Sequence, residues 1–453
     1  MTENNGDGFR IERDPLGEKR IPSEALYGVQ TARARESFRI SKLRIHPLLI
    51  TAIAEIKKAA ATVHLLSGKL PQKTAEAIIE AAGEIIAGEL SAEFDLDVFQ
   101  AGAGTSYNMN VNEVIANRAL EIIGARRGDY AAINPNDDVN KAQSTNDVMP
   151  TAMRISCIRL ARRLEEALDT LADSFDAKAA EFANIEKAGR THLHDATPVT
   201  LGDEFAAWGG NVRRSGEQIR SLEPSLAEIN LGGTAVGKGD NVYAGYQEMV
   251  VEQLAELTQL PLKSATNRMQ LTQSLGDFVA LSGSLRRLAV ELGKIANDLR
   301  LLSSGPHTGL DEIELPAVQP GSSIMPGKVN PAIPEMLNMV AFHVIGQDVA
   351  IMMCAEAGQL ELNVMMPYVA YAILEGLETM TCAIQTFDER CVRVIKAHPE
   401  KCREYRERSV GLAALHNEEL GFMGAAKLAE KAVETGKTID ELVDAGEAEK
   451  QEA

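Results

Sequence analysis

Three kinds of residue are scarce in this 453-residue chain, and each scarcity excludes a class of protein. Aromatic residues make up 4% of the sequence, so the core must come from Leu, Ile, Val, Met and Ala, a composition that favours packed helices over sheets. Positive charge is also scarce, since the formal net charge of −19 argues against nucleic acids and anionic membranes as partners. Cysteine is rare and shows no CxxC spacing, which predicts reduced core thiols at Cys157, Cys354, Cys382, Cys391 and Cys402.

The start of the chain, MTENNGDGFRIERD, lacks the apolar stretch of a signal peptide. We therefore expect a cytoplasmic protein with no membrane span. The length suits about three domains and a large buried core. We expect an all-α fold divided into a mostly helical N-terminal domain (1–143), a central domain of long helices (144–397) and a small C-terminal helical domain (398–453).

Hydrophobic periodicity places several helices along the chain. Apolar residues recur every three or four positions from Pro47 to Gly68, and a second helix is predicted from Pro71 to about Gly88. A shorter helix is predicted from about Asn112 to Ile123. Residues 334–390 have the composition of one long helix that is fully buried.

The clearest pattern is a heptad stripe in which the spacing alternates strictly between three and four residues from Phe278 to Leu302. Such a stripe favours a bundle that packs against other copies of the chain. A bundle formed within one chain is the alternative interpretation.

The segment from Gly321 to Glu335, GSSIMPGKVNPAIPE, interrupts the helical patterns. Its glycines and prolines exclude a helix, while Ser322, Ser323, Lys328 and Asn330 together suit an anion. A phosphate-binding P-loop is excluded, because five residues separate the two glycines and a valine follows the lysine. The alternative is a plain connector with a solvated lysine.

Three further stretches carry hydroxyl and amide groups next to predicted helices. The first (101–112) contains Thr105, Ser106 and Asn108, and the second (143–147) contains Ser144, Thr145 and Asn146. Helix N-termini attract anions, although simple N-capping is the alternative for both. The four stretches together predict a site for a small polar dianion.

The third stretch, Gly189 to Thr200, contains the only closely spaced histidines. His192, His194 and Asp195 could in principle ligate zinc, but no cysteine lies nearby and the remaining ligands are not identifiable. We therefore favour a catalytic or binding role without metal for His192. A structural histidine is the alternative.

Four of these blocks resemble the substrate-binding blocks of the aspartase/fumarase superfamily: GTSYNMNVNEVIANRA, QSTNDVMPTA, GRTHLHDATPVTLG and GSSIMPGKVNP. The resemblance extends over nearly the whole chain. It implies anti elimination from a succinyl-type compound to give fumarate, without a cofactor. It also implies a homotetramer in which each active site combines loops from three subunits.

The resemblance also implies a role for each matching residue. Ser322 would be the base, and Lys328 and loop N–H groups would favour its oxyanion. Asn146 and His192 would lie near the departing group, with Glu335 as the partner of His192. The carboxylate next to the lost proton would be held by Thr105, Ser144, Thr145 and Ser323, and the other carboxylate by Thr191, Lys328 and Asn330.

The leaving group is predicted by comparing the blocks. QST, GTSYNMN and NPAIPE resemble aspartate ammonia-lyases, which favours ammonia. THLHDATP resembles fumarases at least as much, and Met366 departs from the glutamate frequent in aspartases. A fumarase and another succinyl-type lyase are therefore the alternatives. A non-catalytic helical assembly, as in some lens crystallins of the superfamily, is disfavoured by the intact Ser322, Lys328 and Asn330.

Overall fold

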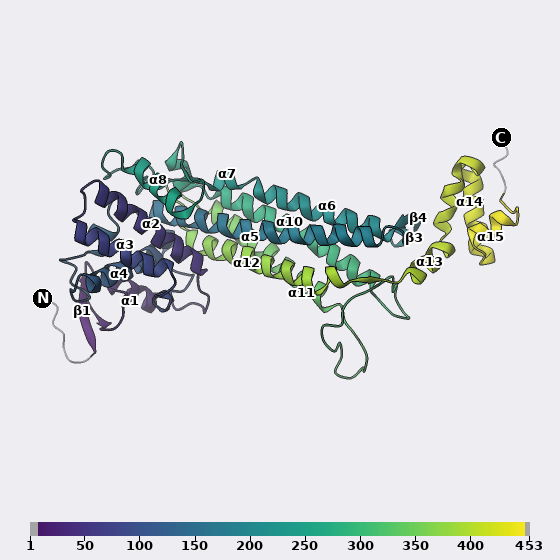
Figure 1. Ribbon diagram of the computed structural model, residues 1–453, viewed down its shortest axis with the longest axis horizontal. Helices are drawn as coiled ribbons and strands as arrows, with labels where there is room; N and C mark the ends of the chain where they lie inside the picture. The colour runs from purple at the N-terminus through teal and green to yellow at the C-terminus, as the bar shows by residue number, and fades with distance from the viewer. Residues whose placement is uncertain (1–7, 449–453) are drawn as a thin grey trace. The chain divides into compact units, whose positions relative to one another are not determined.

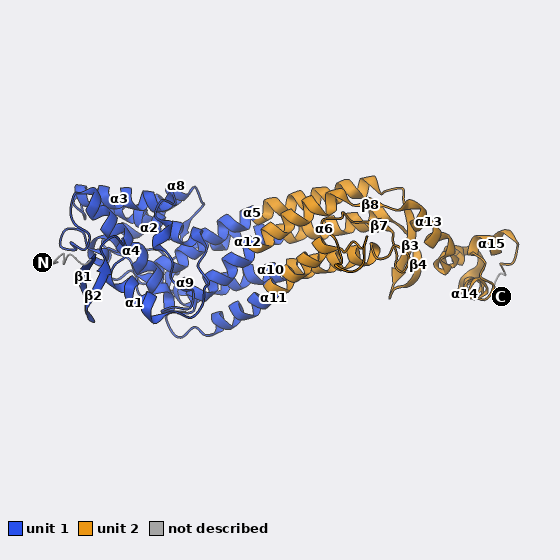
Figure 2. Cartoon of the chain, turned by 90° about the horizontal axis from the view of Figure 1, so that it is seen from below, with its two compact units in different colours: residues 1–163, 218–286, 344–378 blue, residues 164–217, 287–343, 379–453 orange. Residues whose placement is uncertain are grey.

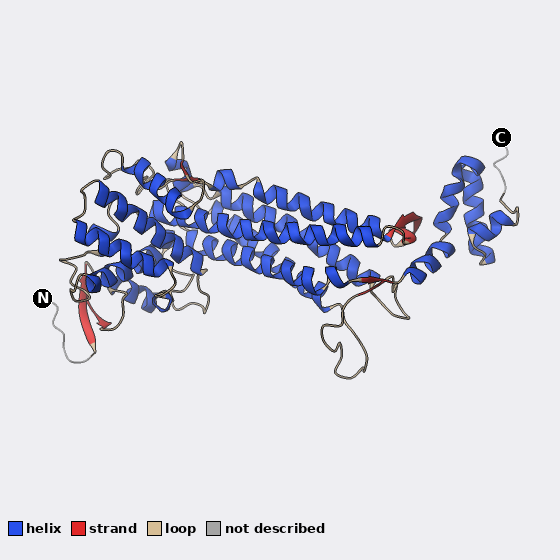
Figure 3. Ribbon diagram, in the orientation of Figure 1, coloured by secondary structure: helices blue, strands red, loops and turns tan. Residues whose placement is uncertain are grey.

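The computed structural model describes residues 8–448, and its regular structure is almost entirely helical (Figure 3), which confirms the prediction of an all-α fold. Within these residues every sheet has two strands. The paired strands are β1 (Phe9–Asp14) with β2 (Gly17–Pro22), β3 (Glu186–Thr191) with β4 (His194–Thr200), β5 (Glu228–Ile229) with β6 (Lys263–Ser264), and β7 (Ile313–Glu314) with β8 (Lys396–Ala397).

The chain forms two compact units that alternate along the sequence (Figure 2). Unit 1 comprises residues 1–163, 218–286 and 344–378, and unit 2 comprises residues 164–217, 287–343 and 379–453. The units alternate because the long helices run from one into the other. These helices are α5 (Thr145–Glu181), α6 (Leu201–Arg220), α10 (Gly276–Leu302), α11 (Ala332–Glu356) and α12 (Met366–Arg390). The three predicted domains remain a prediction.

Unit 1 contains the predicted early helices. α2 (Pro47–Leu66) starts where His46 Nδ1 accepts the N–H of Leu48 and ends before Gly68, whose φ of 62° stops the helix. Both early helices are confirmed, since α3 follows at residues 72–86. The remaining elements of unit 1 are α1 (Val29–Ser37), α3 (Gln72–Ile86), η1 (Ser91–Glu93), η2 (Gly102–Gly104), α4 (Thr105–Ile122), η3 (Pro135–Val139), α7 (Glu223–Leu226), α8 (Tyr246–Thr258) and α9 (Arg268–Gln273).

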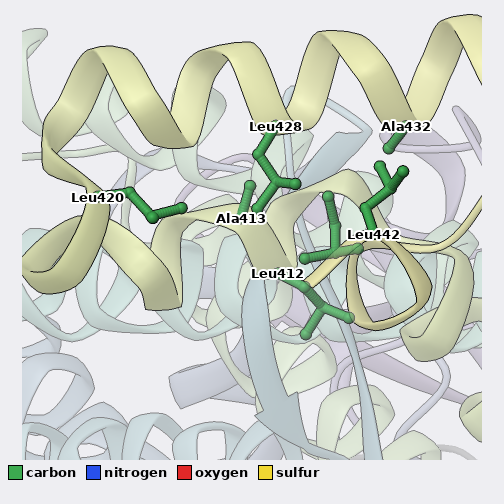
Figure 4. Close-up of a cluster of buried hydrophobic side chains, with 7 residues drawn as sticks. Leu412, Ala413, Leu420, Leu428, Ala432 and Leu442 are labelled. Atoms are coloured by element: carbon green, nitrogen blue, oxygen red, sulfur yellow. The ribbon is translucent and has the colours of Figure 1, made fainter. Parts of the chain in front are cut away.

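Unit 2 contains two features that matter for the site: the β3–β4 hairpin and the long loop between α10 and α11 (Figure 1). Its last part is a small helical group with its own apolar cluster (Figure 4), formed by Leu412, Ala413, Leu420, Leu428, Ala432, Ile439 and Leu442. The elements of this part are η4 (Val392–Val394), α13 (Pro399–Arg408), η5 (Val410–His416), α14 (Asn417–Thr435) and α15 (Ile439–Asp444).

The heptad stripe of α10 is buried within the single chain. Every apolar residue of the stripe, from Phe278 through Leu288 and Ile295 to Leu302, is less than 9% exposed. The stripe therefore packs within the chain, and the packing of the bundle against other copies stays a prediction. A three–four spacing is equally suited to a bundle within one chain, which was the alternative interpretation.

The apolar run at residues 334–390 is not one fully buried helix. Asn363 turns the chain between α11 and α12, because its side-chain amide donates to the carbonyls of Cys354 and Ala355 and so caps the end of α11. α11 itself exposes a heptad stripe of its own, in which the exposed side chain of Phe342 (67%) is the largest. The stripe consists of Met339, Phe342, Gly346, Val349 and Met353. By length and composition alone α11 could cross a membrane, and 39% of its most apolar window is buried.

Candidate active site

The loop before α11 is organised around Ser322. Its hydroxyl oxygen accepts the backbone N–H of Ile324 at 3.2 Å and that of Met325 at 2.9 Å. The base of the loop is closed where Gly321 N–H donates to Lys328 O (2.8 Å) and Asn330 Nδ2 donates to Gly321 O (2.7 Å). A Cβ on Gly321 would lie 2.6 Å from Lys328 O, so this closure requires glycine.

Lys328 is the free cation of this loop. Within residues 8–448 its ammonium has no hydrogen bond or ion pair, and its side chain is exposed, as is that of Ser323. Lys328 and Asn330 line a cavity of about 580 Å³ together with Asp311, Glu314 and His398. An ammonium without a protein partner beside a cavity is available to an anionic ligand.

The β3–β4 hairpin presents His192 at its tip. His192 and Leu193 are the two central residues of the turn, because Thr191 and His194 form the last strand pair. Both central residues have positive φ, 56° and 60°, as a two-residue type I′ turn requires. Asn and Gly usually occupy such positions, so a histidine and a leucine there are strained, which points to a function at the tip.

Buried charges fix this hairpin next to the segment that leads into the loop. The carboxylate of Glu312, which is fully buried, accepts Lys187 Nζ at 2.9 Å and the two terminal nitrogens of Arg190 at 2.9 and 3.1 Å. Lys187 also donates to Glu204 at 2.8 Å. Because Lys187 and Arg190 belong to β3 and Glu312 precedes β7, the pairs hold strand β3 in one position beside that segment.

The hairpin histidines do not form a metal site in the part of the chain that the structure describes, where no group of three or more His, Cys, Asp or Glu side chains is placed to hold an ion. Asp195, one of the residues considered as a ligand, instead accepts the N–H of Val410 at 3.0 Å. The side chains of His192 and Glu335 have no hydrogen-bond or ion-pair partner among residues 8–448. Their predicted pairing is thus not made within one chain and stays a prediction.

Unit 1 holds the other predicted binding residues at two helix N-termini. Thr105 is the first residue of α4 and is exposed, so the helix begins there and not near Asn112 as predicted. Gly104, with φ 84°, provides the turn that allows the early start. Thr145 begins α5, and its hydroxyl oxygen accepts Asn108 Nδ2 at 3.1 Å. The first turn of α4 and the start of α5 therefore lie side by side.

Ser144 acts as the N-cap of α5. Its hydroxyl oxygen accepts the N–H of Asn146 at 3.2 Å, and its own N–H donates to Asp147 Oδ1 at 2.9 Å. Asn146 is fixed by the segment after α7, since its side-chain amide donates to Ala235 O at 2.8 Å. The capping interpretation therefore holds for Ser144, while Thr145 and Asn146 are held by other segments.

Two charged residues beneath this site were not predicted. Lys57 in α2 is completely buried and donates to Asn140 Oδ1 at 2.7 Å and Gln143 Oε1 at 3.0 Å. Burial lowers the pKa of Lys57 to about 7, and burial raises the pKa of Asp147 to about 6. A sequence signal existed, because Lys57 lies four residues after Ile53 and three before Ala60 on the apolar stripe of its helix.

The site residues are divided between the units. Thr105, Ser144, Thr145 and Asn146 belong to unit 1, whereas Thr191, His192, Ser322, Ser323, Lys328, Asn330 and Glu335 belong to unit 2. Met366, where aspartases often have glutamate, is fully buried at the start of α12 and so contributes to the core of the chain.

Comparison with known proteins identifies relatives over almost the whole length. A family described as Lyase matches residues 17–346. An aspartate ammonia-lyase from Pseudomonas aeruginosa is 48% identical, covering 96% of this chain and 92% of the relative. A fumarate lyase:delta crystallin from Brucella melitensis, in a crystal structure bound to cobalt, is 47% identical, with a TM-score of 0.94 over 97% of this chain and 96% of that one. A class II fumarase from Schistosoma mansoni is 35% identical, with a TM-score of 0.93 over 97% and 95%.

Proposed function

This chain belongs to the lyase family that matches residues 17–346, and we propose that it is an aspartate ammonia-lyase, which eliminates ammonia from L-aspartate to give fumarate. The observation that carries the proposal is the 48% identity to an aspartate ammonia-lyase over 96% of the chain. The aspartate ammonia-lyase relatives, together with the family match, place the protein among carbon–nitrogen lyases. The site geometry supports a mechanism for that reaction.

The first step removes a proton from the carbon next to a carboxylate, and Ser322 is the base. A serine hydroxyl ordinarily holds its proton too tightly for this role. The N–H groups of Ile324 and Met325 point at its oxygen, so they stabilise the oxyanion before any substrate arrives. Lys328 adds a positive charge to the same loop.

Removal of that proton places a second negative charge on the adjacent carboxylate, which becomes an aci-carboxylate. Thr105, Ser144, Thr145 and Ser323 hold this group in the proposal. Hydroxyl groups and backbone N–H groups at the starts of α4 and α5 favour such a charge, because both helix dipoles are positive at these ends. Thr191, Lys328 and Asn330 hold the other carboxylate.

The second step breaks the bond between carbon and nitrogen. The electron pair left by the lost proton forms the double bond of fumarate, and the electron pair of the broken bond leaves with the nitrogen. Ammonia departs from the substrate ammonium, while the proton stays on Ser322. Asn146 and His192 lie beside the departing group in this proposal, and no step requires a cofactor or a metal ion.

The active enzyme is proposed to be a homotetramer in which loops from three subunits complete each site. Two observations support this. The side chains of His192 and Glu335 have no hydrogen-bond or ion-pair partner within the described part of one chain. The exposed heptad stripe of α11, centred on Gly346, offers an apolar face that a second copy can cover, with open space above the glycine for close helix approach.

The setting of the reaction follows from the same proposal. The substrate is a small dicarboxylate, and all five cysteines are free thiols, which supports the predicted cytoplasmic location. The function is tested by incubating the purified protein with L-aspartate and measuring fumarate by absorbance and ammonia by a coupled assay. Equal amounts of both products are expected, and the absence of fumarate and ammonia from L-aspartate would contradict the proposal.

A further inference from the structure

We propose that Lys57 is a positioning residue that holds the two carboxylate-binding segments, at the starts of α4 and α5, in one arrangement. The inference rests on the proposed function, because it gives those segments their ligand. Lys57 does not touch the substrate: its side chain is 0% exposed and its ammonium contacts only protein groups.

The ammonium of Lys57 organises the turn that leads into α5. It donates to Asn140 Oδ1 at 2.7 Å and to Gln143 Oε1 at 3.0 Å, and the two residues flank the turn just before Ser144. Asn140 Nδ2 donates in turn to Gln143 O at 3.2 Å. One buried cation therefore fixes both ends of a four-residue segment, which sets the position of Ser144 and Thr145.

The hydrogen bond between Lys57 and Asn140 also links this turn to α4. The side-chain oxygen of Asn140 accepts not only Lys57 but also Asn108 Nδ2 and Asn112 Nδ2, each at 3.2 Å. Asn108 also donates to the hydroxyl oxygen of Thr145 at 3.1 Å. Asn140 thus joins α2, α4 and the start of α5 at one point, and the ammonium of Lys57 polarises its amide so that Nδ2–H is a stronger donor to Gln143 O.

Asp147 holds the turn from the other side. Its Oδ1 accepts the N–H of Ser144, and its Oδ2 accepts those of Gly232 at 3.1 Å and Thr234 at 2.9 Å. Like Lys57, Asp147 is completely buried. The segment that carries Ser144, Thr145 and Asn146 therefore lies between a buried cation and a buried carboxylate.

This arrangement costs more free energy than a purely structural role requires. Burying an ammonium costs free energy, and burial lowers the pKa of Lys57 to about 7. In addition, the side-chain oxygens of Asn108 and Asn112 are buried without a hydrogen-bond partner in the described part of the chain. An apolar side chain at position 57 would avoid the desolvation cost. A cluster kept in spite of that cost is best explained by what it positions.

Three variants test the inference. Lys57→Met removes the donors but keeps the length of the side chain, Lys57→Gln keeps one donating amide, and Lys58→Met makes the same change at the next residue of α2 as a control. We expect Lys57→Met to raise the KM for L-aspartate and the Kd for succinate, an unreactive dicarboxylate, by about 10- to 100-fold. Lys57→Gln should recover part of the affinity, and Lys58→Met should match the wild type.

Circular dichroism and light scattering show whether each variant is folded and assembled. If Lys57→Met does not fold, Asn140→Ala removes the shared acceptor and should produce the same rise in KM and Kd. Wild-type values of KM and Kd in folded Lys57→Met or Asn140→Ala would overturn the inference. So would an equal loss of affinity in Lys58→Met.

Different results would exclude the role of Lys57 and the proposed function. If the wild type converts L-aspartate normally while folded Lys57→Met has an unchanged KM, only the role of Lys57 is wrong. If the wild type converts L-malate and not L-aspartate, the proposed function is wrong. The same variants then report on Lys57 through the KM for L-malate and the Kd for succinate.

Discussion

Ser322 is a weak acid placed where a base is needed. The groups around its hydroxyl allow us to predict how its removal changes kcat and KM. Because the N–H groups of Ile324 and Met325 stabilise its oxyanion, the hydroxyl acts in the proton-transfer step and contributes little to binding. Ser322→Ala should lower kcat by about 10²- to 10⁴-fold with little change in KM. Steady-state kinetics on a folded, assembled variant measures this, and a near-normal kcat would make His192 the next candidate for the base.

Substitution of Lys328 should change the kinetics in a different way, although Lys328 lies in the same loop. Its ammonium has no partner among residues 8–448, so a substrate carboxylate would be its partner before and during the reaction. Lys328→Ala should raise KM about tenfold or more and also lower kcat, because a charge-assisted bond is lost in both states. A change in kcat alone, with succinate binding intact, would contradict this role.

Single residues of the site were predictable where the chemistry is local. Gly, Pro and hydroxyl groups exclude a helix around Ser322, and the loop is found there. Lys57 was missed because its partners, Asn140 and Gln143, are more than 80 positions away in sequence. One sequence shows that a lysine lies on an apolar stripe, but it does not show which distant amides will meet it.

At the scale of elements, the backbone of the β3–β4 turn is strained, and the cost of this strain to stability can be measured. Leu193 has φ 60° and is 73% exposed, so its side chain adds strain to the turn and little burial. Leu193→Gly should raise the free energy of unfolding by about 0.5 to 1 kcal/mol, because glycine adopts positive φ without a steric cost. Thermal or denaturant unfolding measures this, and activity should not fall. A clear loss of stability would mean that the assembly buries Leu193.

Helices were predictable from periodicity, and their ends less so. Pro47 and Gly68 are strong local signals, and α2 ends within two residues of the prediction. α4 begins at Thr105 because Gly104 turns the chain, whereas polar residues such as Asn108 and Asn110 had suggested a loop. These asparagines are buried in the helix, where their side-chain N–H groups donate hydrogen bonds to other segments. Such contacts override the local preference of asparagine for turns.

At the scale of the whole molecule, periodicity identified a stripe without identifying what covers it. The stripe of α10 is buried within the chain, while a similar stripe on α11 is exposed. Both have the three–four spacing of a heptad, so the spacing alone does not distinguish them. The exposed face that supports assembly was therefore found only from the structure.

Assembly through α11 can be tested at its largest exposed residue. Phe342→Glu places a charge in the middle of the apolar stripe, and we expect loss of the tetramer together with most activity, since each site draws on three subunits. Light scattering measures the mass. Phe422→Glu is the matched control, because Phe422 is 76% exposed but lies in α14, and its mass should equal that of the wild type. A fully active Phe342→Glu monomer would contradict the proposed assembly.

The leaving group distinguishes an aspartate ammonia-lyase from a fumarase, because ammonia and water elimination share the base, the carboxylate sites and the product. The direct measurement is kcat/KM of the purified wild type for L-aspartate and for L-malate, followed by the absorbance of fumarate under identical conditions. We expect L-aspartate to be converted, and L-malate to be converted far more slowly or not at all. Fumarate from L-malate only would contradict this expectation.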